Sequence, residues 1–410
     1  MPPAPLHLAV ALDGAGFHPA AWRHPSARPH ELFRPTYWAD LGRTAERGLL
    51  DFVTIEDAFG LQSTRADGVD SRIDQVRGRL EASAVAAFVA SRTSRVGIVP
   101  TAIPTHSEPF HIASIVSTLD HVSRGRAGWR PQVTGRRSDA AHVGRRIVPR
   151  FEPGRIDDAE VQAFVQELFD EASDVVEVVR QLWDSWEDDA EIRDVATGRF
   201  IDREKLHHVD FEGRFFSVRG PSIVPRPPQG NPVVVALAHS RIPYEFAARS
   251  ADVVLVTPAD RSDVARRIAD IRAAEAHVGR TGEPLRILAD LVVVLDDHAD
   301  DATARRAWLD DLDGAPLRSD AAIVATTPDD LAELLLEWAD EGLDGFRLRP
   351  AVIGHDLDAI VDGVVPALQR DGRFRTEYDG GSLRDRLGLP RPPSRYATRA
   401  GSAVVTGVGS

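Results

Sequence analysis

Cysteine is absent from the 410-residue chain. Its absence excludes disulfides, zinc–thiolate sites, iron–sulfur clusters and a thiol nucleophile. A chain without cysteine suits the reducing cytosol, so we expect a cytoplasmic protein. The sequence also lacks a run of about 18 apolar residues, which a membrane-spanning helix needs. The N-terminal residues 1–5 have neither the basic nor the apolar character of a signal peptide. We therefore expect no contact with a membrane.

Basic residues are fewer than acidic residues. Lys and Arg number 49 against 63 Asp and Glu, which gives a net charge of −14. A surface of that sign repels phosphate backbones, so we do not expect nucleic-acid binding. The histidines show no metal-ligand spacing, because the adjacent His207 and His208 point apart on any regular element and His106 and His111 have no carboxylate at helical spacing. We expect no metal site.

A complete glycine motif for phosphate binding is missing too. Gly14 and Gly16 follow the first apolar run, but the third glycine of the dinucleotide fingerprint would fall at Pro19. We therefore expect a flexible loop at the end of a strand rather than a dinucleotide site.

Short apolar runs alternate with longer amphipathic stretches along the whole chain. Eight runs are typical of buried strands, at residues 6–12, 51–57, 96–101, 127–134, 232–238, 252–258, 286–295 and 345–352. Repeated strand–helix units predict parallel pairing with right-handed crossovers. Eight such units indicate an α/β protein with a single closed (β/α)8 TIM barrel.

Two segments interrupt the alternation. Residues 185–231 predict an insertion before the fifth strand, with a hairpin at residues 211–218, and residues 312–327 predict a shorter insertion before the eighth strand. The domain then spans residues 1–393, and the tail of residues 394–410 is low in apolar bulk and expected to be disordered.

Polar residues gather where the strands end. In this fold the chemistry takes place at the C-terminal ends of the strands. The residues expected there include His18, Asp57, Thr101, Arg130 and Ser240. The alternative for Asp57 and Ser240 is that each caps a nearby helix, since Asp and Ser are favoured cap residues.

Five motifs carry a resemblance to a known family. They are PFHIA at 109–113, LDHVSRGRAGW at 119–129, LWDSWEDDA at 182–190, EGRFFSVRGP at 212–221 and VPALQR at 365–370. The sequence resembles bacterial-luciferase-like flavin-dependent monooxygenases over about residues 6–393. Within them it is most similar to the branch of nitrilotriacetate monooxygenase component A and dibenzothiophene-sulfone monooxygenase.

The resemblance implies a chemistry that belongs mainly to a cofactor. Family members receive reduced FMN from a separate NAD(P)H:flavin reductase and react it with oxygen. The resulting flavin C4a-hydroperoxide oxygenates a small organic substrate, and the proteins are commonly homo-oligomers. One alternative is a hydride-transfer oxidoreductase that uses the deazaflavin F420. Another is a non-catalytic flavin-binding protein.

The resemblance also implies roles for individual residues. Asp57 would lie near the flavin ring, Thr101 under the ring, and Ser240 at the FMN phosphate, where a helix start favours an anion. Arg130 stands where the family has asparagine, and Pro243 replaces a phosphate-side glycine and lacks an N–H donor. Arg130, Arg136 or Arg137 are the candidates to replace that contact, because arginine binds phosphate bidentately. The alternative for Arg136 and Arg137 is a solvated loop.

On the substrate side, His18, Trp22, Phe59 and His106 are expected to face the flavin. His106 is a candidate acid–base group because the ordinary pKa of histidine lies near neutrality. The alternatives are a core histidine for His106 and simple packing for Trp22. Arg347 or Arg349 of the last strand is the candidate to favour the anionic reduced flavin through its charge.

Overall fold

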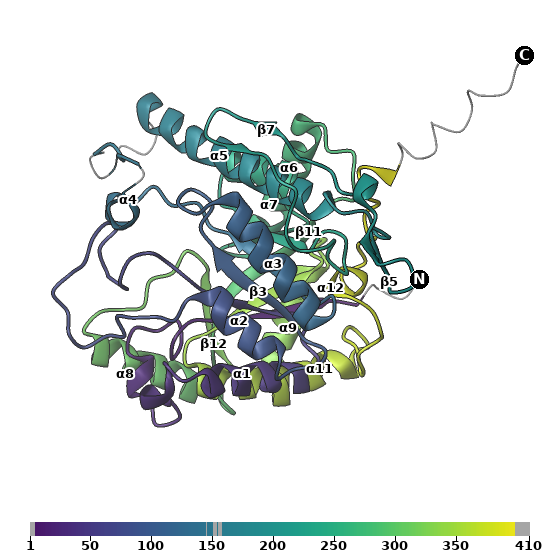
Figure 1. Cartoon of the computed structure of the whole chain (residues 1–410). Helices are drawn as coiled ribbons and strands as arrows, with labels where there is room; N and C mark the ends of the chain where they lie inside the picture. The colour runs from purple at the N-terminus through teal and green to yellow at the C-terminus, as the bar shows by residue number, and fades with distance from the viewer. Residues whose placement is uncertain (1–4, 145, 151–153, 155–157, 398–410) are drawn as a thin grey trace, which may run out of the picture.

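Eight parallel strands close into a barrel (Figure 1). The computed structural model describes residues 5–144, 146–150, 154 and 158–397. The strands, in order around the barrel, are β1 (His7–Leu12), β2 (Phe52–Ile55), β3 (Gly97–Ala102), β4 (Gly128–Pro131), β9 (Val233–Leu237), β10 (Val253–Val256), β11 (Arg286–Leu295) and β13 (Gly345–Pro350). The ring closes between β1 and β13, where His7 lies opposite Gly345. The predicted TIM barrel is confirmed.

The strands are continuous apolar runs rather than alternating ones. All four residues of β2 and of β10 are buried, and β9 reads VVVAL with only its last residue partly exposed. One face of each strand packs inside the barrel and the other packs against the helices, so both faces need apolar side chains.

Helices cover the outside of the barrel (Figure 1). The α-helices of the described residues are α1 (Pro35–Arg47), α2 (Ala82–Ala90), α3 (Pro109–Ser123), α4 (Arg137–Val143), α5 (Ala159–Asp184), α6 (Arg241–Ser250), α7 (Arg261–Val278), α8 (Ala299–Asp313), α9 (Pro328–Ala339), α10 (Ile353–Ala359), α11 (Val365–Arg370) and α12 (Leu383–Arg386). Proline occupies the first position of α1, α3 and α9. Its missing N–H costs nothing there, because that group has no intrahelical partner in any residue type. None of the helices in the described ranges is long and apolar enough to cross a membrane.

The first predicted insertion contains two small hairpins. Strands β5 (Glu191–Asp194) and β6 (Arg199–Ile201) form one, and β7 (Phe211–Glu212) and β8 (Ser217–Val218) form the other. The second is the hairpin expected at residues 211–218.

The second predicted insertion holds an additional strand that the sequence analysis missed. Strand β12 (Ala322–Thr326) pairs in parallel with the second half of β11, beyond the point where β10 ends. All five residues of β12 are only partly buried, so the segment lacks the buried apolar run that marks the barrel strands. The length of β11 leaves a free edge, and β12 covers it.

The start of the predicted disordered tail is ordered. Arg395 lies 3.0 Å from Glu177 and 3.3 Å from Asp184 on α5, and the Tyr396 ring stacks on His207 with centroids 3.7 Å apart. These contacts extend the ordered chain to Ala397. Residues 398–410, which were also part of that prediction, lie outside the described residues.

Candidate active site

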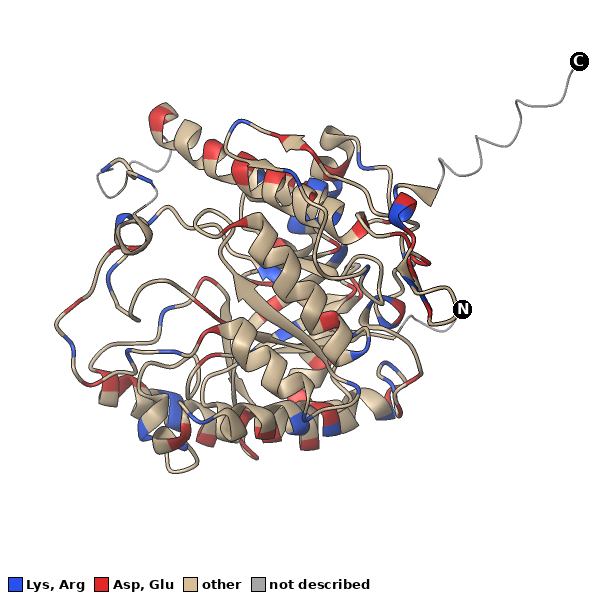
Figure 2. Cartoon of the chain, in the orientation of Figure 1, with Lys and Arg blue, Asp and Glu red and all other residues tan. Residues whose placement is uncertain are grey.

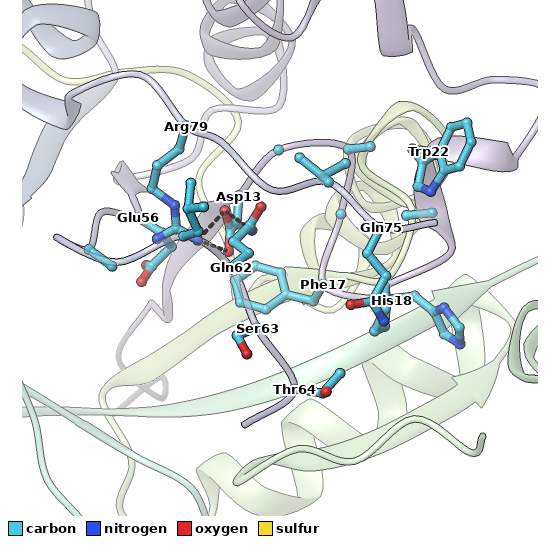
Figure 3. A pocket seen from close by; sticks show the side chains of 18 of the residues that line it. Asp13, Phe17, His18, Trp22, Glu56, Gln62, Ser63, Thr64, Gln75 and Arg79 are labelled. Carbon is cyan, nitrogen blue, oxygen red and sulfur yellow. Dashed lines mark hydrogen bonds and ion pairs between the residues drawn. The ribbon is translucent and has the colours of Figure 1, made fainter. Parts of the chain in front are cut away.

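A cavity of about 720 Å³ lies at the C-terminal ends of β1 and β2. Its lining comes mainly from residues 13–22 after β1, residues 56–79 after β2 and residues 313–318 between α8 and β12. Figure 3 shows side chains of the first two segments around it, with Phe17, His18 and Trp22 among them. Active sites of (β/α)8 enzymes lie at this end of the barrel, so the cavity is the candidate active site.

Asp13 directly follows β1 and forms part of the cavity wall. Its carboxylate lies 3.3 Å from Arg79, and the two residues face each other in Figure 3. Burial raises the pKa of Asp13 to about 6, Arg79 only partly offsets this, and the neighbouring Glu56 adds like-charge repulsion. A carboxyl that titrates near neutrality at a cavity wall is a chemically useful group.

A buried ionic network lies beneath the cavity. Asp290 of β11 is fully buried and accepts hydrogen bonds from Arg347 Nε at 2.9 Å and Arg349 Nε at 2.8 Å. Asp290 sits opposite Arg347 in the sheet register, which brings the charges together. Burial pushes the pKa of Asp290 up, but the two arginines outweigh that and hold it below its usual range. Arg347 and Arg349 share this one carboxylate, and each has a second partner: Glu56 lies 3.1 Å from Arg347, and Asp320 lies 2.6 Å from Arg349. The expectation that one of them favours the reduced flavin stays a prediction.

Arg130 belongs to the same interior. It lies opposite Thr101 in the β3–β4 register and donates to the Thr101 hydroxyl from Nη2 at 3.0 Å. It also pairs with Glu56, which in turn lies 3.1 Å from Arg347. Arg130 is 3% exposed. Its guanidinium is thus held inside the barrel by its neighbours, and it does not line the cavity.

Asp57 lies at the cavity and also binds the start of a helix. It lines the cavity, and its Oδ2 accepts a hydrogen bond at 2.9 Å from the N–H of Ala82, the first residue of α2. Its Oδ1 accepts from the N–H of Ala58 at 2.7 Å. Burial raises the pKa of Asp57, although the two backbone donors oppose the rise.

His18 and Trp22 also line the cavity, but their polar atoms bind protein. His18 Nε2 lies 3.0 Å from Asp310, and its Nδ1 accepts from the N–H of Ala20 at 3.1 Å. Trp22 Nε1 donates to the carbonyl of Asp74 at 3.0 Å. Both rings are therefore held in place, and what they offer a ligand is mainly apolar surface.

Besides Thr101 and Arg130, three more predicted site residues lie outside the cavity lining. The rings of Phe59 and His106 contact each other with centroids 6.0 Å apart, and His106 is 5% exposed. Ser240 precedes α6, is exposed, and makes no side-chain hydrogen bond to that helix. The alternative that the Ser240 hydroxyl caps α6 is therefore wrong for this structure.

The comparison with known proteins decides the family. Residues 15–364 match the family described as luciferase-like monooxygenase. This stretch includes every barrel strand except β1. The chain belongs to the luciferase-like monooxygenase family. The resemblance inferred from the sequence motifs is thereby confirmed, and the chain is a monooxygenase of this family.

Two curated members of the luciferase-like monooxygenase family are similar over nearly the whole chain. N-acetyl-S-(2-succino)cysteine monooxygenase of Bacillus subtilis is 31% identical, covering 96% of this chain and 98% of the relative. Nitrilotriacetate monooxygenase component A of Aminobacter aminovorans is 31% identical with the same coverage. A solved riboflavin lyase, with modified FMN and the substrate riboflavin, superposes with a TM-score of 0.81 at 25% identity, covering 96% of this chain and 98% of that chain.

Sequence reasoning missed several residues of the site. Asp290 had a usable signal, because it is an acidic residue inside the apolar run RILADLVVVL. A buried charge of this kind needs a partner and therefore marks a network. Asp13 had the same positional signal as Asp57, at a strand end. Arg79 had none, since only the folded loop brings it to Asp13. In the described ranges, no cluster of three or more metal-ligating side chains occurs.

Proposed function

We propose that the protein is the oxygenase of a two-component system in the cytoplasm, a homo-oligomer using reduced FMN from a separate NAD(P)H:flavin reductase. The observation that carries the proposal is the family match over residues 15–364 together with a cavity at the strand ends of the same barrel. Bound reduced FMN supplies the electrons with which oxygen is inserted into the substrate.

The described residues fit FMN in two respects. The Ser240 hydroxyl is unused by α6, and the first N–H groups of a helix have no intrahelical partners, which is a donor set suited to phosphate. The cavity of about 720 Å³ lies within the range of roughly 300–1,000 Å³ typical of small-molecule sites. Pro243 removes one further donor, so Ser240 carries a larger share of the phosphate contact.

The chain's own residues then have distinct tasks. Ser240 binds the phosphate. Asp57, held by two backbone N–H groups, presents a fixed acceptor to the flavin ring. Thr101 and Arg130 hold each other in place by a hydrogen bond below the ring, which keeps the base of the flavin site rigid.

The apolar wall has a separate task. Phe17 and Trp22 line the cavity, and Phe59 packs on His106 close by. An apolar wall excludes water, which protects a reactive oxygenating species from wasteful breakdown. His106 is retained as the candidate acid–base residue, and His18, Trp22 and Phe59 as substrate contacts.

The test combines the purified full chain with a separately purified NADH:flavin reductase, FMN and isotopically labelled oxygen gas. The substrate panel holds molecules named for the relatives: nitrilotriacetate, dibenzothiophene sulfone and dimethyl sulfide. We expect one labelled oxygen atom in a product, and none without the reductase. Turnover that proceeds with F420 and without oxygen would instead support hydride transfer. FMN binding without any product would support a non-catalytic role.

An anaerobic titration with each redox form of FMN tests the delivery of reduced flavin. The spent oxidised form must leave, so we expect tighter binding of reduced FMN. A purified protein that carries stoichiometric oxidised flavin would contradict a separate reductase.

A further inference from the structure

The acidic side chains that line the cavity are already engaged within the protein. Asp13 lies 3.3 Å from Arg79, and Asp313 lies 2.9 Å from Arg72. Glu56 pairs with Arg130 and Arg347, while Asp57 accepts two backbone hydrogen bonds. These acidic side chains therefore have counter-charges or hydrogen-bond donors within the protein and do not require a cationic ligand.

Two basic side chains of the lining differ in this respect. Arg136 and Arg318 both line the cavity and are exposed. Within the part of the chain that the structure describes, neither guanidinium has an ion-pair or hydrogen-bond partner. They come from separate parts of the rim: Arg136 precedes α4 in the segment after β4, and Arg318 lies in the segment between α8 and β12.

Residues on both sides of Arg318 are held by contacts within the protein. The N–H of Leu317 donates to Asp310 Oδ1 at 2.7 Å, and the same carboxylate holds His18. On the other side, Asp320 lies 2.6 Å from Arg349. Arg318 is therefore presented to the cavity from a pinned loop, with His18 acting as a positioning residue for it.

Arg136 is presented in a similar way. Its N–H donates to the Thr134 hydroxyl at 3.3 Å, and its carbonyl accepts from the N–H of Ala140 at 3.2 Å. The side chain itself makes no capping hydrogen bond to α4. The backbone is fixed while the guanidinium stays free for a ligand.

The charge of the protein as a whole does not attract an anion. The net charge is −14, and acidic residues recur along α5 and along the helices at the bottom of Figure 2. Two unpaired guanidiniums at one cavity are therefore a local exception. Arginine binds carboxylates bidentately, so the pair suits a ligand with two separated acidic groups.

We propose that the substrate carries at least two carboxylates, which Arg136 and Arg318 bind from separate parts of the cavity rim. This proposal rests on the proposed oxygenase function and names its substrate class. The substrate atom that receives oxygen then lies between the two anchored ends. The relatives' names do not decide this point, because they include both nitrilotriacetate and the uncharged dimethyl sulfide.

The experiment measures binding of propane-1,2,3-tricarboxylate to the full chain by calorimetry, without reductase or oxygen. Each of Arg136→Gln and Arg318→Gln is expected to weaken binding about 10- to 100-fold, as for a lost hydrogen bond to a charged group. Higher ionic strength should weaken wild-type binding, because exposed charges are screened. The uncharged trimethyl ester should not bind measurably. Arg34→Gln, an exposed arginine outside the cavity, is the matched control and should bind like the wild type.

The FMN phosphate is the other anion that these arginines could hold. A parallel titration with FMN and riboflavin separates the two sources. We expect both arginine variants to keep the wild-type preference for FMN over riboflavin. Loss of that preference with unchanged tricarboxylate affinity would assign the arginines to the cofactor and overturn the proposal. Unchanged affinity for both anions would overturn it as well.

The oxygen-labelling test stands apart from these measurements. A chain that binds the tricarboxylate through both arginines but inserts no oxygen into any substrate would refute the oxygenase function while leaving the anion site intact. Oxygen insertion into dimethyl sulfide, together with tricarboxylate binding that neither variant weakens, would refute the anion site alone.

Discussion

The two ends of the barrel use similar residues in opposite ways. At the N-terminal end, Asp51 is fully buried and binds His7 at 3.1 Å, the N–H of Leu8 at 2.8 Å and Arg375 at 2.6 Å. A second cavity of about 670 Å³ at that end is lined by arginines, among them Arg384. Arg384 already has a counter-charge, because it lies 3.2 Å from Asp252. Charge there is satisfied internally and serves the fold.

At the C-terminal end, some charges of the cavity lining are not satisfied internally. Asp290 is matched by two arginines, yet nearer the cavity Asp13 has a raised pKa and Arg136 and Arg318 lack partners among the described residues. Chemistry in this fold takes place at this end. Charged side chains occur at both ends of the barrel. The functional end differs because some of its charged side chains have no partner within the described residues.

The largest expected effect tests the interior network. Asp290→Asn leaves Arg347 and Arg349 buried without their main counter-charge. Breaking a buried pair typically costs about 3–5 kcal/mol of stability. We expect that loss in the free energy of unfolding, measured by urea denaturation at neutral pH.

Asp51→Asn is the counterpart at the other end of the barrel. It should also lower the unfolding free energy, because Asp51 is buried among His7 and Arg375. Its affinity for FMN should stay at the wild-type value. An equal loss of FMN affinity in both variants would contradict the functional division between the two ends.

The second prediction concerns pH. Because the pKa of Asp13 is raised from 3.8 to about 6, the folded state binds more protons than the unfolded state between these values. Stability therefore falls as pH rises through that window. Asp13→Asn removes the penalty and should stabilise the protein at pH 7 by up to about 3 kcal/mol.

The measurement for Asp13 is the unfolding free energy of both proteins across pH 4 to 8. The advantage of the variant should shrink as the pH falls towards 4, where both forms of the folded protein carry a neutral group. A constant difference across the range would show that Asp13 does not titrate in this window.

The third prediction separates phosphate from ring binding. Ser240→Ala should weaken FMN by about 1.5–3 kcal/mol, the value for a hydrogen bond to a charged group. Riboflavin has no phosphate and should bind as before. Fluorescence titration measures both ligands, and equal weakening of the two would remove Ser240 from the phosphate site.

The smallest effect on stability is expected for an ion pair at the protein surface. Arg395→Ala removes partly exposed pairs with Glu177 and Asp184, and Asp184 keeps its contact with Arg226 at 3.0 Å. Exposed ion pairs contribute at most about 1 kcal/mol. Thermal unfolding should show a shift near the detection limit. A loss of stability comparable to that of Asp290→Asn would mean that the ion pairs of Arg395 are essential to the fold.

Much of the architecture could be predicted because it depends on local pattern. The run VVVAL of β9 and the prolines that begin α1, α3 and α9 carry their structural meaning in a few consecutive residues. Strand β12 could not be predicted in this way. It exists because the far half of β11 offers a free edge, which is a property of the assembled sheet.

The candidate site divides along the same line. The sequence placed Asp57, His18 and Trp22 at strand ends, and all three line the cavity. It could not tell that Arg130 turns inward to Thr101 and Glu56, or that Arg347 and Arg349 share the carboxylate of Asp290. Those outcomes depend on the register between strands that lie far apart in the chain.

The sequence by itself determined the barrel, its insertions and the family, because periodicity and short motifs are local properties of the chain. Only the tertiary structure decided which charged side chains form ion pairs with one another and which remain available to a ligand. Asp13 meets Arg79 across 66 positions of sequence, and Asp290 meets Arg347 across 57. Pairing over such separations follows from the closed sheet and its loops, and no local pattern encodes it.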